Sequence, residues 1–173
     1  MKFEPAQIAV QGKQAFENKQ FDQAAGLFRQ AAEGFKADHS DLMTAEMMNN
    51  LSVALLQGGR AQEALDAALG TDQTFAGLGD IKRQGMAVGN QAAALDSLNR
   101  HDEAIAAYER SAELFAQVGE GDLRSMVMKS AAAIKLKKGS LTDSAFKMMG
   151  SLDVKDNPTF FERILKFLLR LIK

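Results

Sequence analysis

The hydrophobic positions of this chain follow a helical period and recur in units of nearly constant length. Three alanines, Ala24, Ala64 and Ala104, are each 40 residues apart along the chain. Each is preceded, twelve positions earlier, by a small residue and followed, four positions later, by a second packing position: Gly12, Ser52 and Ala92 before, and Phe28, Ala68 and Tyr108 after. Residues three and four apart share one face of a helix. The pattern therefore predicts a repeated helical unit in which small residues let two helices approach closely.

Short polar breaks divide each unit into two antiparallel helices. They are ENKQ before Phe21, QGGR before Ala61, NRHD before Glu103 and KKGSL before Thr142. Between units, GLGDI (77–81) and VGEGDL (118–123) combine glycines that stop a helix with an Asp that can cap the next one. The fourth copy matches less closely, because its residues align only when the spacing is 41 instead of 40. The matching residues are Ala133, Leu136, Ala145 and Met149. A simple helical bundle would not require the sequence pattern to recur at a fixed spacing, so a repeat array is the favoured interpretation.

The skeleton of these units resembles the tetratricopeptide repeat family over roughly residues 5–152. The family's alternation of small, aromatic and alanine positions is matched by Gly12, Ala15, Ala24, Phe28 and Ala31, and again by Ala92, Leu95, Ala104 and Tyr108. The 40-residue spacing and the LGD junction resemble the subgroup with extended helices. The chain departs from the family in lacking the tryptophan of the first helix and the proline that ends a unit, and in placing Ala68 where an aromatic is usual.

The resemblance implies an all-α fold, a right-handed α-solenoid of four helix pairs with a concave groove lined by the first helix of each pair. The expected repeat domain covers residues 1–152, in units of about 5–40, 41–80, 81–120 and 121–152. A linker (153–157) and a C-terminal amphipathic helix (158–173) follow.

The resemblance further implies that a peptide or a partner helix binds in this groove. The residues expected to line it are Lys13, Asn49, Asn50, Met86 and Asn90. Asn50 and Asn90 occupy the same position in adjacent units, and a carboxamide can both donate to and accept from a peptide backbone. Alternatively, these asparagines are solvated or bond within the array. The family's basic clamp for a carboxylate is not matched, because the third unit offers Met86 and Asn90 where cations are wanted.

The final segment, PTFFERILKFLLRLIK, predicts an amphipathic helix with a wide apolar face and a net charge of +3. Its expected contact face comprises Phe160, Phe161, Ile164, Leu165, Phe167, Leu168, Leu171 and Ile172. Three surfaces could cover it: the end or groove of the repeat array, a membrane interface, or a second helix from a partner or another copy. Within the groove, the tail would act as a built-in ligand.

The composition limits the classes of function that this chain can have. The net charge of −1 gives no field that would attract nucleic acid, and no cysteine is present. We find no secretory signal, no apolar run long enough to span a membrane, and no phosphate loop, metal-binding or nucleophile motif. The sequence therefore predicts neither an enzyme nor a metal or cofactor site. It predicts a cytoplasmic protein, which would be peripheral to a membrane if the C-terminal helix binds one.

Two functions follow as expectations. The first is an adaptor or scaffold that binds a protein or peptide of unknown identity in the groove. The alternative is a peripheral membrane or assembly scaffold, anchored or self-associated through residues 158–173.

Overall fold

The computed structural model describes residues 4–152, and their side chains as far as Gly139. Over this range the chain forms eight α-helices. They are α1 (Pro5–Glu17), α2 (Phe21–Ala37), α3 (Asp41–Gln57), α4 (Ala61–Ala68), α5 (Thr71–Gly77), α6 (Ile81–Ser97), α7 (His101–Gln117) and α8 (Gly121–Leu152). The predicted linker and C-terminal helix lie outside the described residues.

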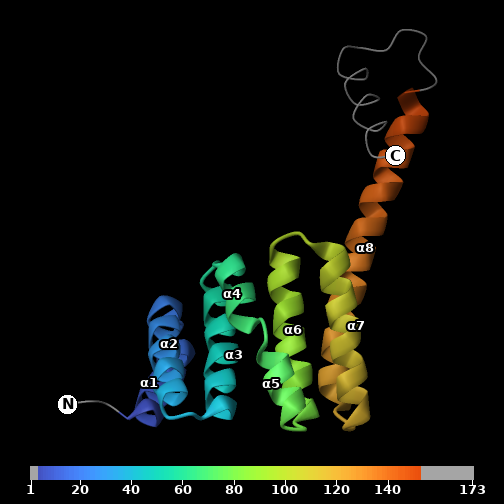
Figure 1. The fold of residues 1–173 in the computed structure, drawn as a ribbon. Helices are drawn as coiled ribbons and strands as arrows, with labels where there is room; N and C mark the ends of the chain where they lie inside the picture. The colour runs from blue at the N-terminus through green and yellow to red at the C-terminus, as the bar shows by residue number, and fades with distance from the viewer. Residues whose placement is uncertain (1–3, 153–173) are drawn as a thin grey trace. The chain divides into compact units, whose positions relative to one another are not determined.

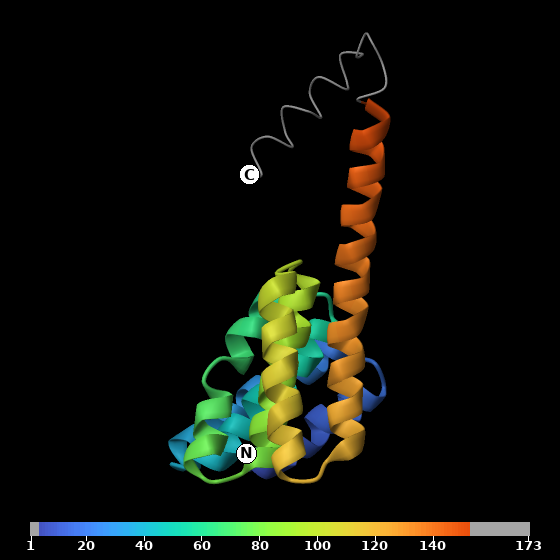
Figure 2. The ribbon, with the colours of Figure 1, turned by 90° about the vertical axis from the view of Figure 1, so that its right-hand side faces the viewer.

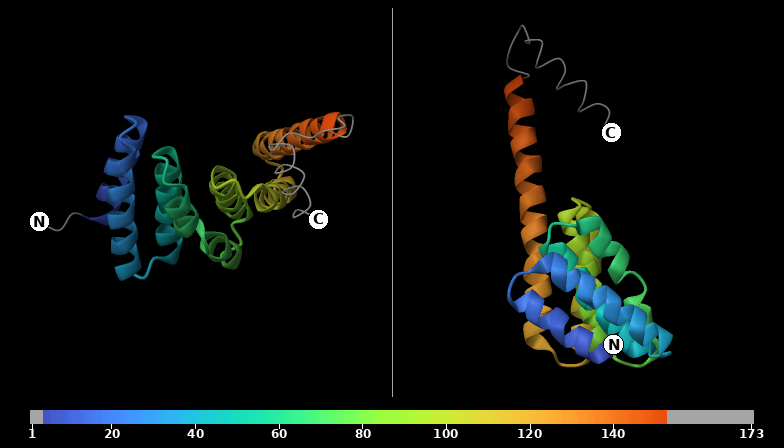
Figure 3. Two further views of the ribbon diagram at one scale, coloured as in Figure 1. Left: turned by 90° about the horizontal axis from the view of Figure 1, so that it is seen from above. Right: turned by 90° about the vertical axis from the view of Figure 1, so that its left-hand side faces the viewer.

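The chain divides into two compact units, Met1–Ala132 and Ala133–Lys173. The first contains α1–α7 and the start of α8, and its helices lie in antiparallel pairs that follow one another in chain order (Figure 1). α1 packs on α2, α3 on α4, and α6 on α7, while α2–α3 and α4–α6 contacts join successive pairs. The same order is visible from above in Figure 3, and Figure 2 shows α7 beside the start of α8. The predicted α-solenoid is confirmed.

The seam within each pair is built from the small residues that the repeat predicted. Ala24, Ala64 and Ala104 are all 0% exposed. In the first pair Gly12 lies under the buried ring of Phe28, so close that a β-carbon placed on Gly12 would be 2.9 Å from the ring. In the second pair the Ser52 hydroxyl donates a 2.7 Å hydrogen bond to the carbonyl oxygen of Ala64. The alanines are therefore the places where two helix backbones come together.

A second buried contact lies near the other end of the second and third pairs. Phe75 and Phe115 occupy equivalent positions in successive units and are almost fully buried. Phe75 packs in a buried cluster with Ala45 and Ala87, and the Phe115 ring would meet a β-carbon on Gly85 at 2.9 Å. A large ring against a small residue is thus the recurrent contact of the array.

The turns repeat more regularly than the helices. The turns that follow α1, α2, α3, α5, α6 and α7 each contain one residue with positive φ. These residues are spaced by half the repeat length and are Lys19, His39, Gly59, Gly79, Asn99 and Gly119. The two inter-unit junctions predicted to stop a helix contain Gly79 and Gly119 at these positions. At Asp80 the predicted cap is confirmed, because its carboxylate accepts a 2.9 Å hydrogen bond from the Arg83 backbone N–H. Asp122 instead lies in the first turn of α8, one residue inside the helix.

The second helix of the second unit is interrupted, which the repeat pattern did not predict. α4 ends at Ala68, Leu69 is extended, and Gly70 has a φ of +82° before α5 begins. The corresponding helices α2 and α7 are continuous over 17 residues. Ala68 stands where they have Phe28 and Tyr108, so less side-chain volume holds this helix straight, and the neighbouring Gly70 tolerates the left-handed conformation.

The structure differs from the predicted fourth helix pair at the break expected within it. No break occurs at KKGSL, and α8 continues without interruption from Gly121 to Leu152. The segment is rich in Lys, Ala and Leu, which favour helix, and a single interior glycine costs only about 1 kcal/mol. The described part of the array therefore has three helix pairs and one long helix.

The tight contact at Gly12 makes a matched prediction. We expect Gly12→Ala to lower the free energy of unfolding by about 1–3 kcal/mol, because the new methyl group must displace a buried aromatic ring. Gly26→Ala, in α2 and with no atom within 4 Å of the new β-carbon, should instead raise it by about 0.5–1 kcal/mol. Urea unfolding followed by circular dichroism measures both; equal effects of the two substitutions would contradict the proposed seam.

The Asp80 cap predicts a pH dependence. The hydrogen bond from the Arg83 backbone N–H lowers the pKa of Asp80, and the Arg83 side chain lowers it further, against an opposing effect of desolvation. A lowered folded pKa stabilises the fold above the ordinary carboxyl pKa of about 4, and this contribution is lost as the pH falls through the folded pKa. Asp80→Ala should therefore cost about 1 kcal/mol at pH 7 and progressively less in acid. Asp80→Asn, which keeps a capping side chain, is the control; a cost of Asp80→Ala that does not change with pH would rule out the charged cap.

Candidate peptide-binding groove

Two hollows open at equivalent places on the first helices of the array. The α1–α3 hollow has a volume of about 180 Å³ and is lined by Lys13, Phe16, Glu17, Phe28, Asn50 and Val53. The α6–α8 hollow has a volume of about 230 Å³. Its floor includes Tyr108, which corresponds to Phe28 two units earlier, and its wall includes Ser130, which corresponds to Asn50. The repeat thus places the same kind of cavity twice.

The α6–α8 hollow is mainly apolar. It is bordered by Met86 and Met126, both well exposed, and floored by the rings of Tyr108 and Phe115. Burial raises the pKa of Tyr108, while a hydrogen bond with the Ser130 side chain opposes this and the nearby Asp96 charge adds to it. The tyrosine is therefore neutral at ordinary pH, and the hollow offers an uncharged lining with a hydroxyl at its base.

The three asparagines expected in the groove have different environments. Asn90 donates from Nδ2 to Asn49 Oδ1 at 2.8 Å, and Asn49 is only 8% exposed. Asn90 thus bonds within the repeat array, which was the alternative to binding a peptide backbone. Asn50 lines the α1–α3 hollow and makes no side-chain hydrogen bond among the described residues, so its carboxamide is available to a ligand.

Lys13 and Met86 lie one in each hollow, and Asn90 accompanies Met86 in the α6–α8 hollow. The structure therefore divides the five expected residues among two hollows and one buried position rather than bringing them together. Arg83, at the groove edge, is engaged with Asp80 at 2.6 Å and with Glu46 at 3.6 Å. No cluster of free cations forms a carboxylate clamp at these residues.

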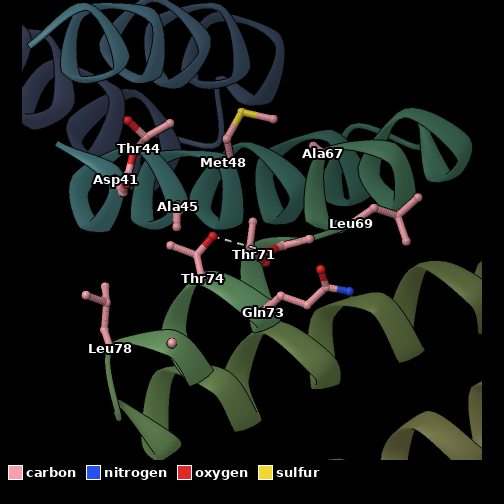
Figure 4. Close-up of a pocket in the computed structure, with 12 residues that line it drawn as sticks. Asp41, Thr44, Ala45, Met48, Ala67, Leu69, Thr71, Gln73, Thr74 and Leu78 are labelled. Atoms are coloured by element: carbon pink, nitrogen blue, oxygen red, sulfur yellow. Dashed lines mark hydrogen bonds between the residues drawn. The ribbon is translucent and has the colours of Figure 1, made fainter. Parts of the chain in front are cut away.

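A larger pocket, of about 530 Å³, lies where the second unit is broken (Figure 4). Thr44 and Met48 reach it from α3, Leu69 from the break, and Gln73 and Thr74 from α5 (Figure 4). This pocket was not predicted from the sequence, although Gly70 and the absence of an aromatic at Ala68 were visible signals of a weak helix.

A polar network compensates for the break. The carbonyl oxygen of Ala68, freed by the interruption, accepts hydrogen bonds from Thr71 Oγ1 at 2.8 Å and from Gln91 Nε2 at 3.1 Å. Gln91 also donates to Asp72 at 3.0 Å, and Arg110 pairs with the other Asp72 oxygen at 3.1 Å. The Asp72 side chain is 6% exposed, so leaving it unpaired would be costly. α6 and α7 therefore hold the broken helix in place.

Other kinds of site find no support among residues 4–152. Searched over this range, no group of three His, Asp or Glu side chains is arranged to hold a metal ion. None of the helices described there has both the length and the apolar character needed to cross a membrane. The contact face predicted at Phe160–Ile172 lies outside the described residues.

Comparison with known proteins agrees with this architecture. Residues 10–77 match the model of the tetratricopeptide repeat family. Among solved structures, 17 chains match. One is the apo form of RapI, which is 13% identical and superposes with a TM-score of 0.71. The match covers 89% of this chain and 44% of the RapI chain. The chain therefore spans less than half the length of RapI, and at this identity the likeness shows the fold alone. No curated protein sequence matches the chain.

These findings first define the class: an α-solenoid of helix pairs, a fold that serves in general for protein interaction. Within this fold, residues 10–77 match the tetratricopeptide repeat model, so this part of the chain is similar to that family.

Proposed function

We propose that this protein is an adaptor that binds a peptide or helical segment of a protein partner along the first helices of its repeats. The observation that carries the proposal is the pair of equivalent hollows with Asn50 beside one of them and Asn90 beside the other. A ligand lying across α1, α3, α6 and the start of α8 would place side chains in both hollows.

The chemistry of the hollows supports an apolar ligand with a regular backbone. Phe16, Phe28 and Val53 in one hollow, and Met86, Tyr108 and Met126 in the other, offer apolar contact area. Methionine side chains adapt to varied shapes, which suits a partner segment more than a small rigid ligand. The Asn50 carboxamide can bind a peptide unit whatever its side chain.

Charge contributes little to selecting the ligand. Lys13 and Glu17 border the same hollow and carry opposite charges. Arg83 is paired with Asp80 and Glu46. An acidic tail would therefore find no concentrated positive surface at these residues, and the preferred ligand is one with apolar anchors.

Asn50→Ala provides the cleanest test of the groove. Peptides selected from a random display library on the full chain should lose about five- to tenfold in affinity, measured by fluorescence anisotropy, because one or two hydrogen bonds to the backbone are removed. Asn50 has no internal side-chain bond among the described residues, so stability should not change. Asn90→Ala is less clean, since it leaves Asn49 without its donor.

The matched control is Gln23→Ala, which removes an exposed carboxamide from α2, the second helix of the first unit. Its peptide affinities should equal those of the wild type. Selected peptides that bind Asn50→Ala and wild type equally would contradict groove binding through this residue.

A second candidate function rests on the wide apolar face predicted for residues 158–173. A peripheral membrane scaffold would use this basic, Phe- and Leu-rich segment as its anchor. We expect the full chain to sediment with vesicles containing anionic lipid in that event, and Leu165→Lys with Leu168→Lys to abolish sedimentation by charging the apolar face. Lys166→Glu tests the electrostatic part separately. A chain that stays in the supernatant with vesicles of every composition would reject the membrane function and leave the adaptor unaffected.

A further inference from the structure

The pocket at the break of the second unit is closed at the equivalent places in the neighbouring units. We call it the break pocket, and both Ala45 of α3 and Thr74 of α5 line it. In the first unit the matching residues are Pro5 and Gly34, and a β-carbon on Gly34 would lie only 2.6 Å from the Pro5 ring. In the third unit Gly85, which matches Ala45, lies directly under an aromatic ring of α7. The break pocket is therefore a specific product of the interrupted helix.

The break pocket lies on the side of α3 opposite the proposed peptide groove. Thr44 and Met48, one helical turn apart, line the pocket, whereas Asn50 lines the α1–α3 hollow. The step of two positions from Met48 to Asn50 turns by about 200° around the helix. A ligand in the break pocket would leave the groove open, so the two sites can be tested independently.

Two exposed leucines border the opening of the break pocket. Leu69 and Leu78 lie on either side of it (Figure 4) and are 61% and 56% exposed. Leu69 matches Arg29 and Glu109 in the neighbouring units, and Leu78 matches Asp38 in the first unit. Large apolar side chains thus replace charged ones at the mouth of a pocket, which is typical of a site for an apolar ligand. We therefore expect the body of the ligand to be apolar.

The hydroxyl groups that line the break pocket can only accept further hydrogen bonds. Thr44, Thr71 and Thr74 each donate the hydroxyl proton to a main-chain carbonyl oxygen three or four residues earlier, at 2.9, 2.8 and 3.3 Å respectively. Because a hydroxyl group has one proton, each of these oxygens retains acceptor capacity alone. A ligand that bonds to them must supply the donors.

The charge of the break pocket has one sign. Among the described residues that line it, Asp41 alone is charged, and its carboxylate is a further acceptor. An ammonium group combines hydrogen-bond donors with the complementary positive charge, and charge-assisted hydrogen bonds are stronger than neutral ones. The lining therefore favours a protonated amine over an alcohol or a carboxylate.

We propose that the break pocket binds a small organic amine, with its apolar body against Leu69 and Leu78 and its ammonium group near Asp41. The volume of about 530 Å³ lies within the range of pockets that take small organic molecules. A single lysine side chain from a partner protein would leave most of this volume empty, so a free amine fits the pocket better. The interruption of the second unit thus turns a helix seam into a ligand site.

The first experiment uses tryptamine as the probe, because the full chain has no tryptophan and the indole fluorescence reports the probe alone. In equilibrium dialysis we expect tryptamine to bind with a dissociation constant of about 1 mM or lower. Tryptophol, which has a hydroxyl group in place of the amine, should bind about three- to tenfold more weakly. Indole-3-propionate, which has a carboxylate there, should bind more weakly still.

The second experiment tests the two parts of the pocket separately. Asp41→Asn should reduce the affinity for tryptamine to that for tryptophol and leave the affinity for tryptophol unchanged, because only the charge is removed. Asp122→Asn is the matched control, since Asp41 and Asp122 both lie in the first turn of a long helix; it should change neither affinity. Thr74→Leu introduces the residue found at the matching Leu114 and should weaken all three probes at least about tenfold by filling the pocket, with the fold checked by circular dichroism.

Three results would overturn the proposal. One is the absence of tryptamine binding at about 10 mM free probe, where a ligand of this size should occupy a real pocket. Another is equal affinity of the wild-type chain for the amine, the alcohol and the carboxylate, since the site would then not recognise charge. The third is tryptamine binding that a folded Thr74→Leu variant retains in full, which would place the probe elsewhere. Each of these results would leave the proposed peptide groove unaffected.

Discussion

The close approach of a small residue to a large ring is the constraint on which this array depends. Gly12 lies under Phe28 and Gly85 under Phe115, each at a distance that leaves no room for a β-carbon. Such contacts fix how near two helices of a pair lie and where along their length they cross. Because the contact recurs from unit to unit, its repetition positions the first helices in succession and so creates equivalent hollows between them. The candidate groove is a consequence of the seam rather than a separate feature.

Where the seam lacks its large member, the helix pair changes. Ala68 replaces an aromatic in the second unit, and there the second helix breaks at Gly70. Polar bonds from Gln91 and Arg110 then stabilise the break, while the buried ring of Phe75 packs α5 against Ala45 and Ala87. In the fourth unit the sequence offers only methionines at the corresponding positions, and α8 remains one continuous helix. Both departures from the regular repeat follow from one missing contact.

The sequence predicted the parts of the fold that depend on spacing. The three alanines, the breaks at ENKQ and QGGR, and the Asp80 cap follow from residues whose local preference agrees with the packing around them. The break predicted at KKGSL is absent because Gly139 permits a turn without imposing one, and the Lys, Ala and Leu residues around it favour helix. The bond between Asn90 and Asn49 was equally beyond the sequence, since two carboxamides so far apart in the chain give no signal of which one faces the other. Periodicity therefore located the groove but not the hydrogen bonds made by its residues.

The two exposed methionines of α8 show how one helix can serve two surfaces. Met126 borders the α6–α8 hollow, whereas Met128 lies with Ser125 and Ala132 on another exposed face of α8, and a step of two positions corresponds to a rotation of about 200° around a helix. Side chains on nearly opposite sides of a helix do not compete for the same ligand. A peptide in the hollow leaves the exposed face around Met128 uncovered, and both surfaces depend on the same buried residues, Val127 and Ala131, that attach α8 to the array. Any change that loosens this attachment should weaken both surfaces at once, whereas a change at Met126 or Met128 should affect only one.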